Sequence, residues 1–378
     1  MARRRLFSSC IVLMALTGAG TPLWGQTAGF AYVANCGNVC LGIGPGDVSA
    51  YSIDGTTGAL TPVAGSPFPA GTGPFSVTVD PTGQFAYVAN GGSNNVSAYT
   101  IDGTTGALTA VAGSPFAAGS RPSSVTVEPK GQFAYVANAG FGSNNVSAYS
   151  INGITGALTP VAGSPFPAGF EPVSVTVDPT GQFAYVANDS SDNISAYSIN
   201  GTTGALTPVA GSPFPAGESP NSVTVDPTGQ FTYVTNASSE NVSAYSLDGF
   251  TGALTPVGGS PFPAGGSPES VTVNPTGQFA YVANFLTNNV SAYAIDGITG
   301  ALAPVAGSPF PAGSFPASVT VDSTGQFAYV ANQGGGNVSA YNINGTTGAL
   351  TAVDGSPFPA GSSPVSVTTT AGPPPPVF

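Results

Sequence analysis

Carboxylates are the side chains of this chain that could most readily do chemistry, because other common catalytic groups are nearly absent. The 378 residues include 17 Asp and Glu, five Lys and Arg, and no His. Three basic residues, Arg3–Arg5, lie at the N-terminus, which leaves Arg121 and Lys130 for the rest of the chain. No phosphate-cradling loop, nucleophile elbow or metalloprotease motif is present. The sequence alone therefore assigns no catalytic residue.

The acidic residues fall into two main groups. One group recurs in turns where Asp alternates with Asn, and its expected role is to accept hydrogen bonds from turn amides. A second group lies in variable loops and should form a crescent on one side of the molecule: Glu171, Asp189, Asp192, Glu218, Glu240 and Glu269. Such a crescent would attract a cation or a basic partner surface, or it would be a solvated acidic edge.

Asp189 and Asp192 share one loop and are the candidate ligands for a Ca²⁺ ion. No other cofactor is expected. Arg121 is the basic residue nearest to the crescent.

Aromatic residues also occur where the sequence varies, and they are Phe75, Phe141, Phe170, Phe285 and Phe315. Exposed rings could stack against a carbohydrate or anchor a protein partner, or they could fill the centre of the molecule. With Arg121 and the acidic crescent they define a candidate binding rim for an unknown protein or carbohydrate. The formal net charge of −12 argues against nucleic acid and anionic lipid as partners.

A repeated phrase dictates the scaffold that must position these side chains. Close variants of Phe-Ala-Tyr-Val-Ala-Asn have their tyrosines at Tyr32, Tyr87, Tyr135, Tyr185, Tyr233, Tyr281 and Tyr329. A period of about 48 residues, built from short apolar strands and Gly/Pro turns, is typical of a β-propeller with one four-stranded blade per repeat. The sequence therefore predicts an all-β, seven-bladed propeller.

The two ends of the repeat array predict how the ring closes. The first repeat begins at Phe30 without the Ser-Val-Thr-Val strand that precedes every later copy, and the chain ends with an unmatched version, Val365–Thr369. We expect this C-terminal strand to pair into blade one, which removes the free strand edges. The variable loops should then emerge on one face and the repeated turns on the other.

Segments outside the repeats indicate processing and export. Residues 1–25 read as a signal peptide, with a basic start, an apolar run too short for an ordinary membrane anchor, and cleavage after Ala19 or nearer Gly25. The propeller is expected over 26–370 and a proline-rich tail over 371–378. We therefore expect no membrane-spanning segment in the mature chain, and a periplasmic, cell-surface or extracellular location.

Two cysteines of the expected mature chain lie in one loop. Cys36 and Cys40 favour a local disulfide in an oxidising compartment. A metal site is the alternative, although two thiolates without histidine supply few ligands.

The Tyr-Val-Ala-Asn or Tyr-Val-Thr-Asn phrase resembles that of the YVTN-repeat propellers, as do the Asp-Pro-Thr-Gly turn before it and the Asp-Gly-Thr-Thr-Gly-Ala-Leu segment after it. These belong with the seven-bladed lactonase-like superfamily that includes 6-phosphogluconolactonase-type enzymes. The resemblance covers Phe30–Thr370 and implies the seven-bladed fold. It also implies histidine, arginine and glutamate near the central channel, and no such catalytic residue carries over to this chain.

Two functions are weighed on these grounds. The first is a non-catalytic binding or scaffold propeller at the cell envelope or outside the cell. The alternative is a sugar-lactone hydrolase, which the resemblance in fold implies. An enzyme would need an activated water and an oxyanion stabiliser, whereas a binding protein needs neither.

Overall fold

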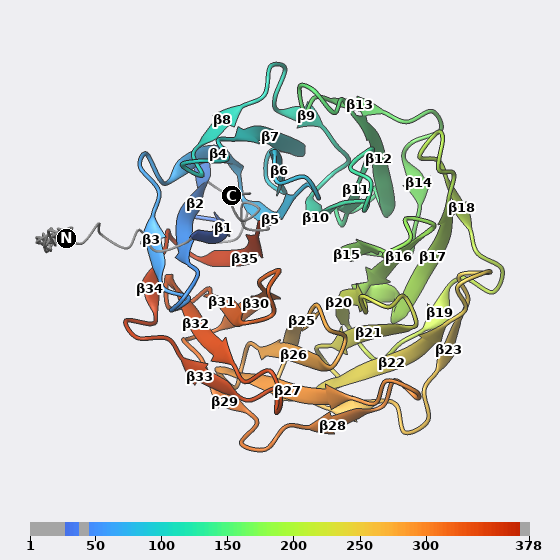
Figure 1. Ribbon diagram of the computed structural model, residues 1–378. Helices are drawn as coiled ribbons and strands as arrows, with labels where there is room; N and C mark the ends of the chain where they lie inside the picture. Colours follow the sequence, from blue (N-terminus) through green and yellow to red (C-terminus); the bar gives the residue numbers. More distant parts are fainter. Residues whose placement is uncertain (1–26, 38–44, 371–378) are drawn as a thin grey trace, which may run out of the picture.

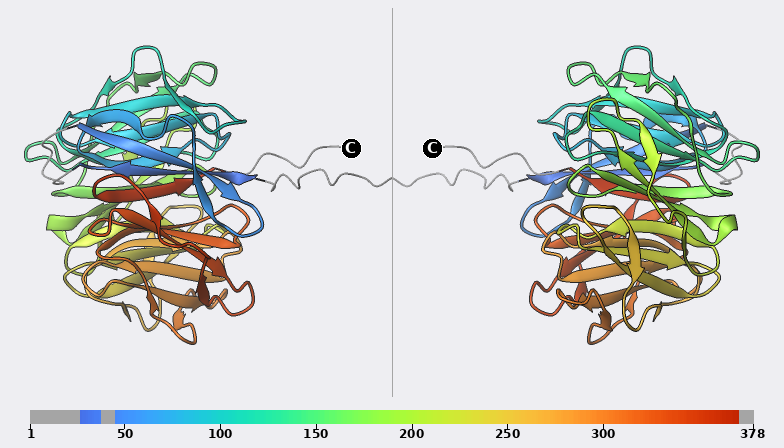
Figure 2. Two further views of the ribbon diagram at one scale, coloured as in Figure 1. Left: turned by 90° about the vertical axis from the view of Figure 1, so that its left-hand side faces the viewer. Right: turned by 90° about the vertical axis from the view of Figure 1, so that its right-hand side faces the viewer.

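The computed structural model describes residues 27–37 and 45–370. In this part of the chain, seven antiparallel sheets stand around a central axis, and the one helical segment is a 3₁₀ turn, η1 (Asp189–Ser191). Figure 1 looks along the axis of the ring, and Figure 2 shows the ring edge-on. The predicted seven-bladed propeller is confirmed.

Each blade has the same strand order from the axis outward. The innermost strands are β35 (Pro364–Thr369), β5 (Pro74–Val79), β10 (Pro122–Val127), β15 (Pro172–Val177), β20 (Pro220–Val225), β25 (Pro268–Val273) and β30 (Pro316–Val321). The second strands are β1 (Thr27–Asn35), β6 (Phe85–Asn90), β11 (Phe133–Asn138), β16 (Phe183–Asn188), β21 (Phe231–Asn236), β26 (Phe279–Asn284) and β31 (Phe327–Asn332).

The third strands are β2 (Pro45–Asp54), β7 (Asn95–Ile101), β12 (Asn145–Ile151), β17 (Asn193–Ile199), β22 (Asn241–Leu247), β27 (Asn289–Ile295) and β32 (Asn337–Ile343). The fourth strands are β3 (Leu60–Pro62), β8 (Leu108–Ala110), β13 (Leu158–Pro160), β18 (Leu206–Pro208), β23 (Leu254–Pro256), β28 (Leu302–Pro304) and β33 (Leu350–Ala352).

The outer edge of each blade carries a further short strand. These strands are β4 (Phe68–Thr72), β9 (Phe116–Ala117), β14 (Phe166–Pro167), β19 (Phe214–Pro215), β24 (Phe262–Pro263), β29 (Phe310–Pro311) and β34 (Phe358–Pro359). Each pairs with the start of the third strand, whereas the fourth strand pairs with its end; β14, for example, pairs at Asn145 and Val146, and β13 at Tyr149–Ile151. The outer edge of each blade thus has two short strands, whereas the sequence predicts one.

Ring closure follows the prediction. β35 joins the sheet of β1, β2 and β3, with Val33 opposite Val367. A side chain also links the two ends of the described chain, because the Thr370 hydroxyl accepts a hydrogen bond from the Phe30 N–H at 2.8 Å. The first blade is therefore built from both ends of the described chain.

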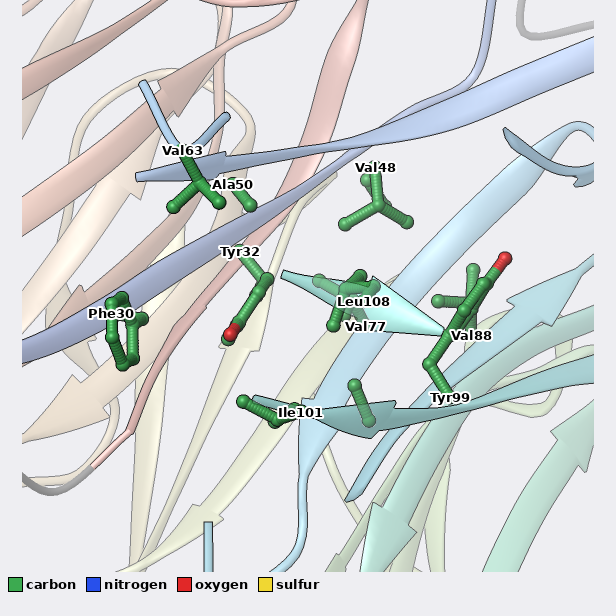
Figure 3. Close-up of a cluster of buried hydrophobic side chains, with 12 residues drawn as sticks. Phe30, Tyr32, Val48, Ala50, Val63, Val77, Val88, Tyr99, Ile101 and Leu108 are labelled. Atoms are coloured by element: carbon green, nitrogen blue, oxygen red, sulfur yellow. The ribbon is translucent and has the colours of Figure 1, made fainter. Parts of the chain in front are cut away.

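Blades pack face to face through apolar clusters, which explains why the strands are apolar or small on both sides. Figure 3 shows one cluster, in which Phe30, Tyr32 and Val48 of blade one face residues of blade two. The buried Tyr32 hydroxyl donates to the carbonyl oxygen of Gly106 in blade two at 2.9 Å. The same bond recurs around the ring and ends with Tyr329 donating to Gly58 at 3.0 Å.

The repeated turns gather on one face, here called the turn face, and their acids have the predicted structural role. Asp80 is buried, and its carboxylate accepts hydrogen bonds from the N–H groups of Gln84 and Phe85 at 2.8 and 2.6 Å. Asp54 accepts from the N–H groups of Thr56 and Thr57, both at 2.9 Å.

The predicted signal peptide, the proline-rich tail and Cys40 lie outside the described residues. Within the described ranges, no helix is long and apolar enough to cross a membrane. Cys36 is disulfide-bonded, which agrees with the expected local disulfide, and its pairing with Cys40 stays a prediction.

Candidate active site on the loop face

The variable loops meet on the face opposite the turns, here called the loop face, as predicted. In blade four the N–H of Asp189, just after the second strand, donates to the carbonyl of Glu171, just before the first strand, at 2.9 Å. The same backbone bond joins Ala139 to Arg121 in blade three at 2.9 Å. The backbone of this face thus repeats from blade to blade, and its side chains do not.

Three equivalent positions at the inner ends of the blades carry these differing side chains. The inner position is the second residue of each innermost strand: Val365, Phe75, Ser123, Val173, Asn221, Glu269 and Ala317. The shoulder position precedes that strand and has a left-handed backbone: Ser363, Gly73, Arg121, Glu171, Ser219, Ser267 and Phe315. The loop position follows the second strand: Cys36, Gly91, Ala139, Asp189, Ala237, Phe285 and Gln333.

Arg121 is held between its two neighbouring blades. Its Nη1 lies 2.7 Å from Glu171 Oε1, and its guanidinium carbon lies 5.9 Å from the centre of the Phe75 ring. The other oxygen of Glu171 accepts a hydrogen bond from the Ser190 hydroxyl at 2.9 Å. Arg121, which the sequence gives as the basic residue nearest to the crescent, therefore neutralises one of its carboxylates.

Asp189 is the half-buried carboxylate beside this ion pair. Burial raises its pKa, and the negative charges of Glu171 and Asp192 raise it further. A hydrogen bond from Ser219 and the positive charge of Arg121 oppose that rise. Asp189 thus lies close to both a cation and other carboxylates.

Glu269 is a second partly buried carboxyl group, at the inner position of blade six. Its Oε2 lies 2.6 Å from Asn221 Nδ2, and its Oε1 accepts a hydrogen bond from the Ser267 hydroxyl at 2.9 Å. Burial raises its pKa, the Ser267 bond lowers it, and the charge of Asp189 raises it. Glu269 and Asp189 are therefore electrostatically coupled.

The other acids of the crescent are held by a backbone contact or are exposed. Asp192 accepts a hydrogen bond from the Ser219 N–H at 2.9 Å. In the same way, Asn94 accepts from the Arg121 N–H and Asn144 from the Glu171 N–H. Glu218 and Glu240 are exposed. In the part of the chain that the structure describes, no three His, Cys, Asp or Glu side chains are grouped to hold a metal ion. The Ca²⁺ site at Asp189 and Asp192 stays a prediction.

The predicted rim aromatics lie at different places on the loop face. Phe75 packs under Arg121 and against Gly91, where an added Cβ would lie 2.2 Å from the ring. The rings of Phe285 and Phe315 stack with their centres 4.9 Å apart.

Phe141 and Phe170 are well exposed, and in the described residues neither takes part in a stacked ring pair.

Several polar members of the site escape sequence reasoning. Asn221, Ser219, Ser267 and Ser190 are common residue types in loops of ordinary composition. Aligning the repeats would have placed Asn221 beside Glu269, because the two occupy the same position in consecutive blades.

The chain matches the family described as lactonase, seven-bladed β-propeller, over residues 38–216 and 262–369. These ranges make up well over half of the sequence, so the chain belongs to this family. Among curated proteins, no sequence matches it significantly.

Solved structures with the same fold have different described activities. A candidate 6-phosphogluconolactonase from Bacteroides uniformis is 20% identical, with a TM-score of 0.77 over 91% of this chain and 100% of that one. The periplasmic gluconolactonase PpgL of Pseudomonas aeruginosa is 19% identical, with a TM-score of 0.75 over 91% and 99%. Hydrazine synthase of Kuenenia stuttgartiensis, also 19% identical, has a TM-score of 0.60 over 88% and 99%. At such identities the likeness shows the fold.

The expectation of a non-catalytic binding or scaffold protein is wrong. Membership of the lactonase family, together with the lactonase-type structural neighbours, favours the lactone-hydrolase alternative. That expectation relied on the absence of histidine and of the other catalytic residues that the family resemblance implies.

Proposed function

We propose that this protein hydrolyses lactones of uncharged sugars at the centre of the loop face. The observation that carries the proposal is the half-buried Asp189 beside the Arg121–Glu171 ion pair. This arrangement puts a proton acceptor near a fixed cation, and lactone hydrolysis needs both an activated water and a stabilised oxyanion. Membership of the lactonase family supports the same reaction.

Asp189 is the proposed general base. It removes a proton from a water molecule as the water oxygen attacks the carbonyl carbon of the lactone. A carboxylate is a weak base at its ordinary pKa, and the raised pKa of Asp189 brings it closer to neutral pH, where proton transfer is more effective.

Arg121 is the proposed oxyanion stabiliser. As water adds, the electron pair of the C=O bond moves to the carbonyl oxygen, and a nearby guanidinium favours that charge. Contacts with Glu171 and Phe75 on opposite neighbouring blades hold the guanidinium in place before substrate binds. The oxyanion then re-forms the C=O bond as the ring C–O bond breaks, and the ring oxygen takes a proton, which yields a hydroxy acid.

The charge around the site favours a substrate without phosphate. Glu171 pairs with Arg121, Asp189 lies near that cation, and Glu269 adds a third carboxyl group beside Asp189. Lys130, the other basic residue of the expected mature chain, lies in a turn on the opposite face. Phosphate recognition ordinarily uses several cations or oriented amides, and the carboxylates here would repel a dianion.

Hydrolysis assays with matched substrates test this proposal. The purified protein should accelerate gluconolactone hydrolysis above the spontaneous rate, and its kcat/KM for the 6-phosphorylated lactone should be at least about tenfold lower, since one charge repulsion of about 1.4 kcal/mol suffices. An equal or higher kcat/KM for the phosphorylated lactone would reject the substrate class. No acceleration of either lactone would reject the activity.

We further propose that the protein is exported after removal of residues 1–25. The basic and apolar pattern of that segment supports export, and so does the disulfide at Cys36. Mass spectrometry of the protein recovered from fractionated cells should find a shortened N-terminus outside the cytoplasm. An intact chain confined to the cytoplasm would contradict this proposal.

A further inference from the structure

Glu269 has surroundings that suit a proton donor. Among the seven residues at the inner position, Glu269 alone is ionisable. The other six are Val365, Phe75, Ser123, Val173, Asn221 and Ala317. Its carboxyl group therefore faces neutral neighbours along this ring. In the described residues, the one ion pair joins Arg121 to Glu171, so no cation neutralises Glu269.

The contact between Glu269 and Asn221 can form in either protonation state of the carboxyl group. The observed separation from Glu269 Oε2 to the Asn221 amide is 2.6 Å. Turning the amide by half a turn would let the protonated Oε2 donate to the Asn221 oxygen, because amide N and O are assigned from their partners.

Ser267 fits the same protonation state. Its hydroxyl donates to the other oxygen, Oε1, at 2.9 Å, and that oxygen accepts in either form of the acid. Burial and the charge of Asp189 both favour the protonated form. Two coupled carboxyl groups whose surroundings differ in this way are suited to separate acid and base roles.

We propose that Glu269 is the general acid of the lactonase reaction and donates its proton to the ring oxygen of the substrate. This inference rests on the proposed function, in which Asp189 takes a proton from the attacking water. When the ring C–O bond breaks, its electron pair goes to the ring oxygen, and the Glu269 proton completes the alcohol. Asp189 then holds one extra proton and Glu269 lacks one, and exchange with solvent restores both.

Two lactones with different leaving groups test the assignment. Gluconolactone expels an alkoxide, which needs a proton, whereas dihydrocoumarin expels a phenoxide with a pKa of about 10, as for tyrosine. Glu269→Gln should lower kcat on gluconolactone by at least about 100-fold, the usual contribution of a general acid, and kcat on dihydrocoumarin by less than about fivefold.

A pH profile provides a second measurement. For the wild-type protein, kcat/KM should fall at low pH as Asp189 protonates and at high pH as Glu269 ionises. Glu269→Gln should lose the high-pH fall, which a merely structural change would not remove. Asp354→Asn, an exposed carboxylate near the outer edge of blade seven, serves as the matched control and should keep wild-type rates.

The outcomes separate this inference from the proposed function. Suppose that wild-type protein hydrolyses lactones. If Glu269→Gln then lowers kcat equally on gluconolactone and dihydrocoumarin, or lowers it on neither, Glu269 is not the general acid. If Glu269→Gln does not fold, Glu269→Asp keeps the acid and should retain the high-pH fall at a reduced rate; its loss would overturn the assignment. Wild-type protein without activity on either lactone would instead defeat the proposed function.

Discussion

Asp178 on the turn face and Asp189 on the loop face are carboxylates of one blade in very different surroundings. Asp178 is almost fully buried, and its oxygens accept hydrogen bonds from the N–H groups of Gln182 and Phe183 at 2.8 and 2.7 Å. Asp189 is half-buried among other carboxylates, and its pKa is raised. The comparison shows that backbone amides make the first carboxylate part of the fold, while burial without enough donors leaves the second available for chemistry.

The largest expected effect on stability is on the turn face. Asp178→Ala leaves the buried N–H of Phe183 and the partly buried N–H of Gln182 without an acceptor, so the free energy of unfolding should fall by about 3 kcal/mol. Urea denaturation measures the loss, and kcat/KM of the remaining folded protein should stay unchanged.

Blade six provides a natural control for this change. Asn274 holds the equivalent turn and accepts from Gln278 and Phe279 at 3.0 and 2.9 Å, so Asp178→Asn should cost less than about 1 kcal/mol. Equal losses for the Ala and Asn variants would show that the backbone bonds do not account for the role of Asp178.

Arg121→Lys should affect the loop face without disturbing the fold. Lysine keeps the charge and loses the planar guanidinium that contacts both Glu171 and Phe75. We expect kcat on gluconolactone to fall about tenfold, or 1.4 kcal/mol, while the melting temperature changes little. Steady-state kinetics and a thermal melt provide the two values, and an unchanged kcat would remove Arg121 from the proposed mechanism.

Asp189→Asn should stabilise the protein at neutral pH by a small amount. The pKa of Asp189 is raised in the folded state. At pH values between the ordinary and the raised pKa, the folded state therefore binds more protons than the unfolded state, and stability falls as pH rises through that range. The variant should therefore melt higher than wild type at pH 7 and equally at pH 3. A lower melting temperature at pH 7 would mean that Asp189 stabilises the fold.

The exposed turn acids should show the smallest effect, with the opposite sign. Backbone N–H groups of Thr105 and Thr104 lower the pKa of Asp102, so its contribution to stability is present above its ordinary pKa and is lost as pH falls through the lowered value. Asp102→Asn should flatten the fall in melting temperature below about pH 4, the ordinary range for Asp. Asn152 already holds the same turn in blade three.

The repeat pattern predicted the scaffold because each blade must bury both faces against its neighbours. The unmatched Val365–Thr369 strand predicted closure, and the separation of turns from variable loops predicted the two faces. Acids that break the repeat pointed to Glu171, Asp189 and Glu269, all of which lie in the candidate site.

Contacts between blades are what the sequence did not reveal. Arg121 and Glu171 are about one repeat apart and meet because their blades are neighbours. Asp192 resembled a metal ligand, although it substitutes for asparagine in a repeated backbone contact. Burial raises the pKa values of Asp189 and Glu269, and burial of an individual loop side chain follows only from the folded loops.

A paired measurement on blade four tests the central claim that the loop face holds the catalytic carboxylate. Gluconolactone kcat/KM and the melting temperature are measured for wild type, Asp189→Asn and Asp178→Asn. We predict a loss of about 100-fold to 10,000-fold in kcat/KM for Asp189→Asn with no loss of stability, and wild-type kcat/KM for Asp178→Asn. Wild-type activity in Asp189→Asn, or an equal loss in both variants, would contradict the account.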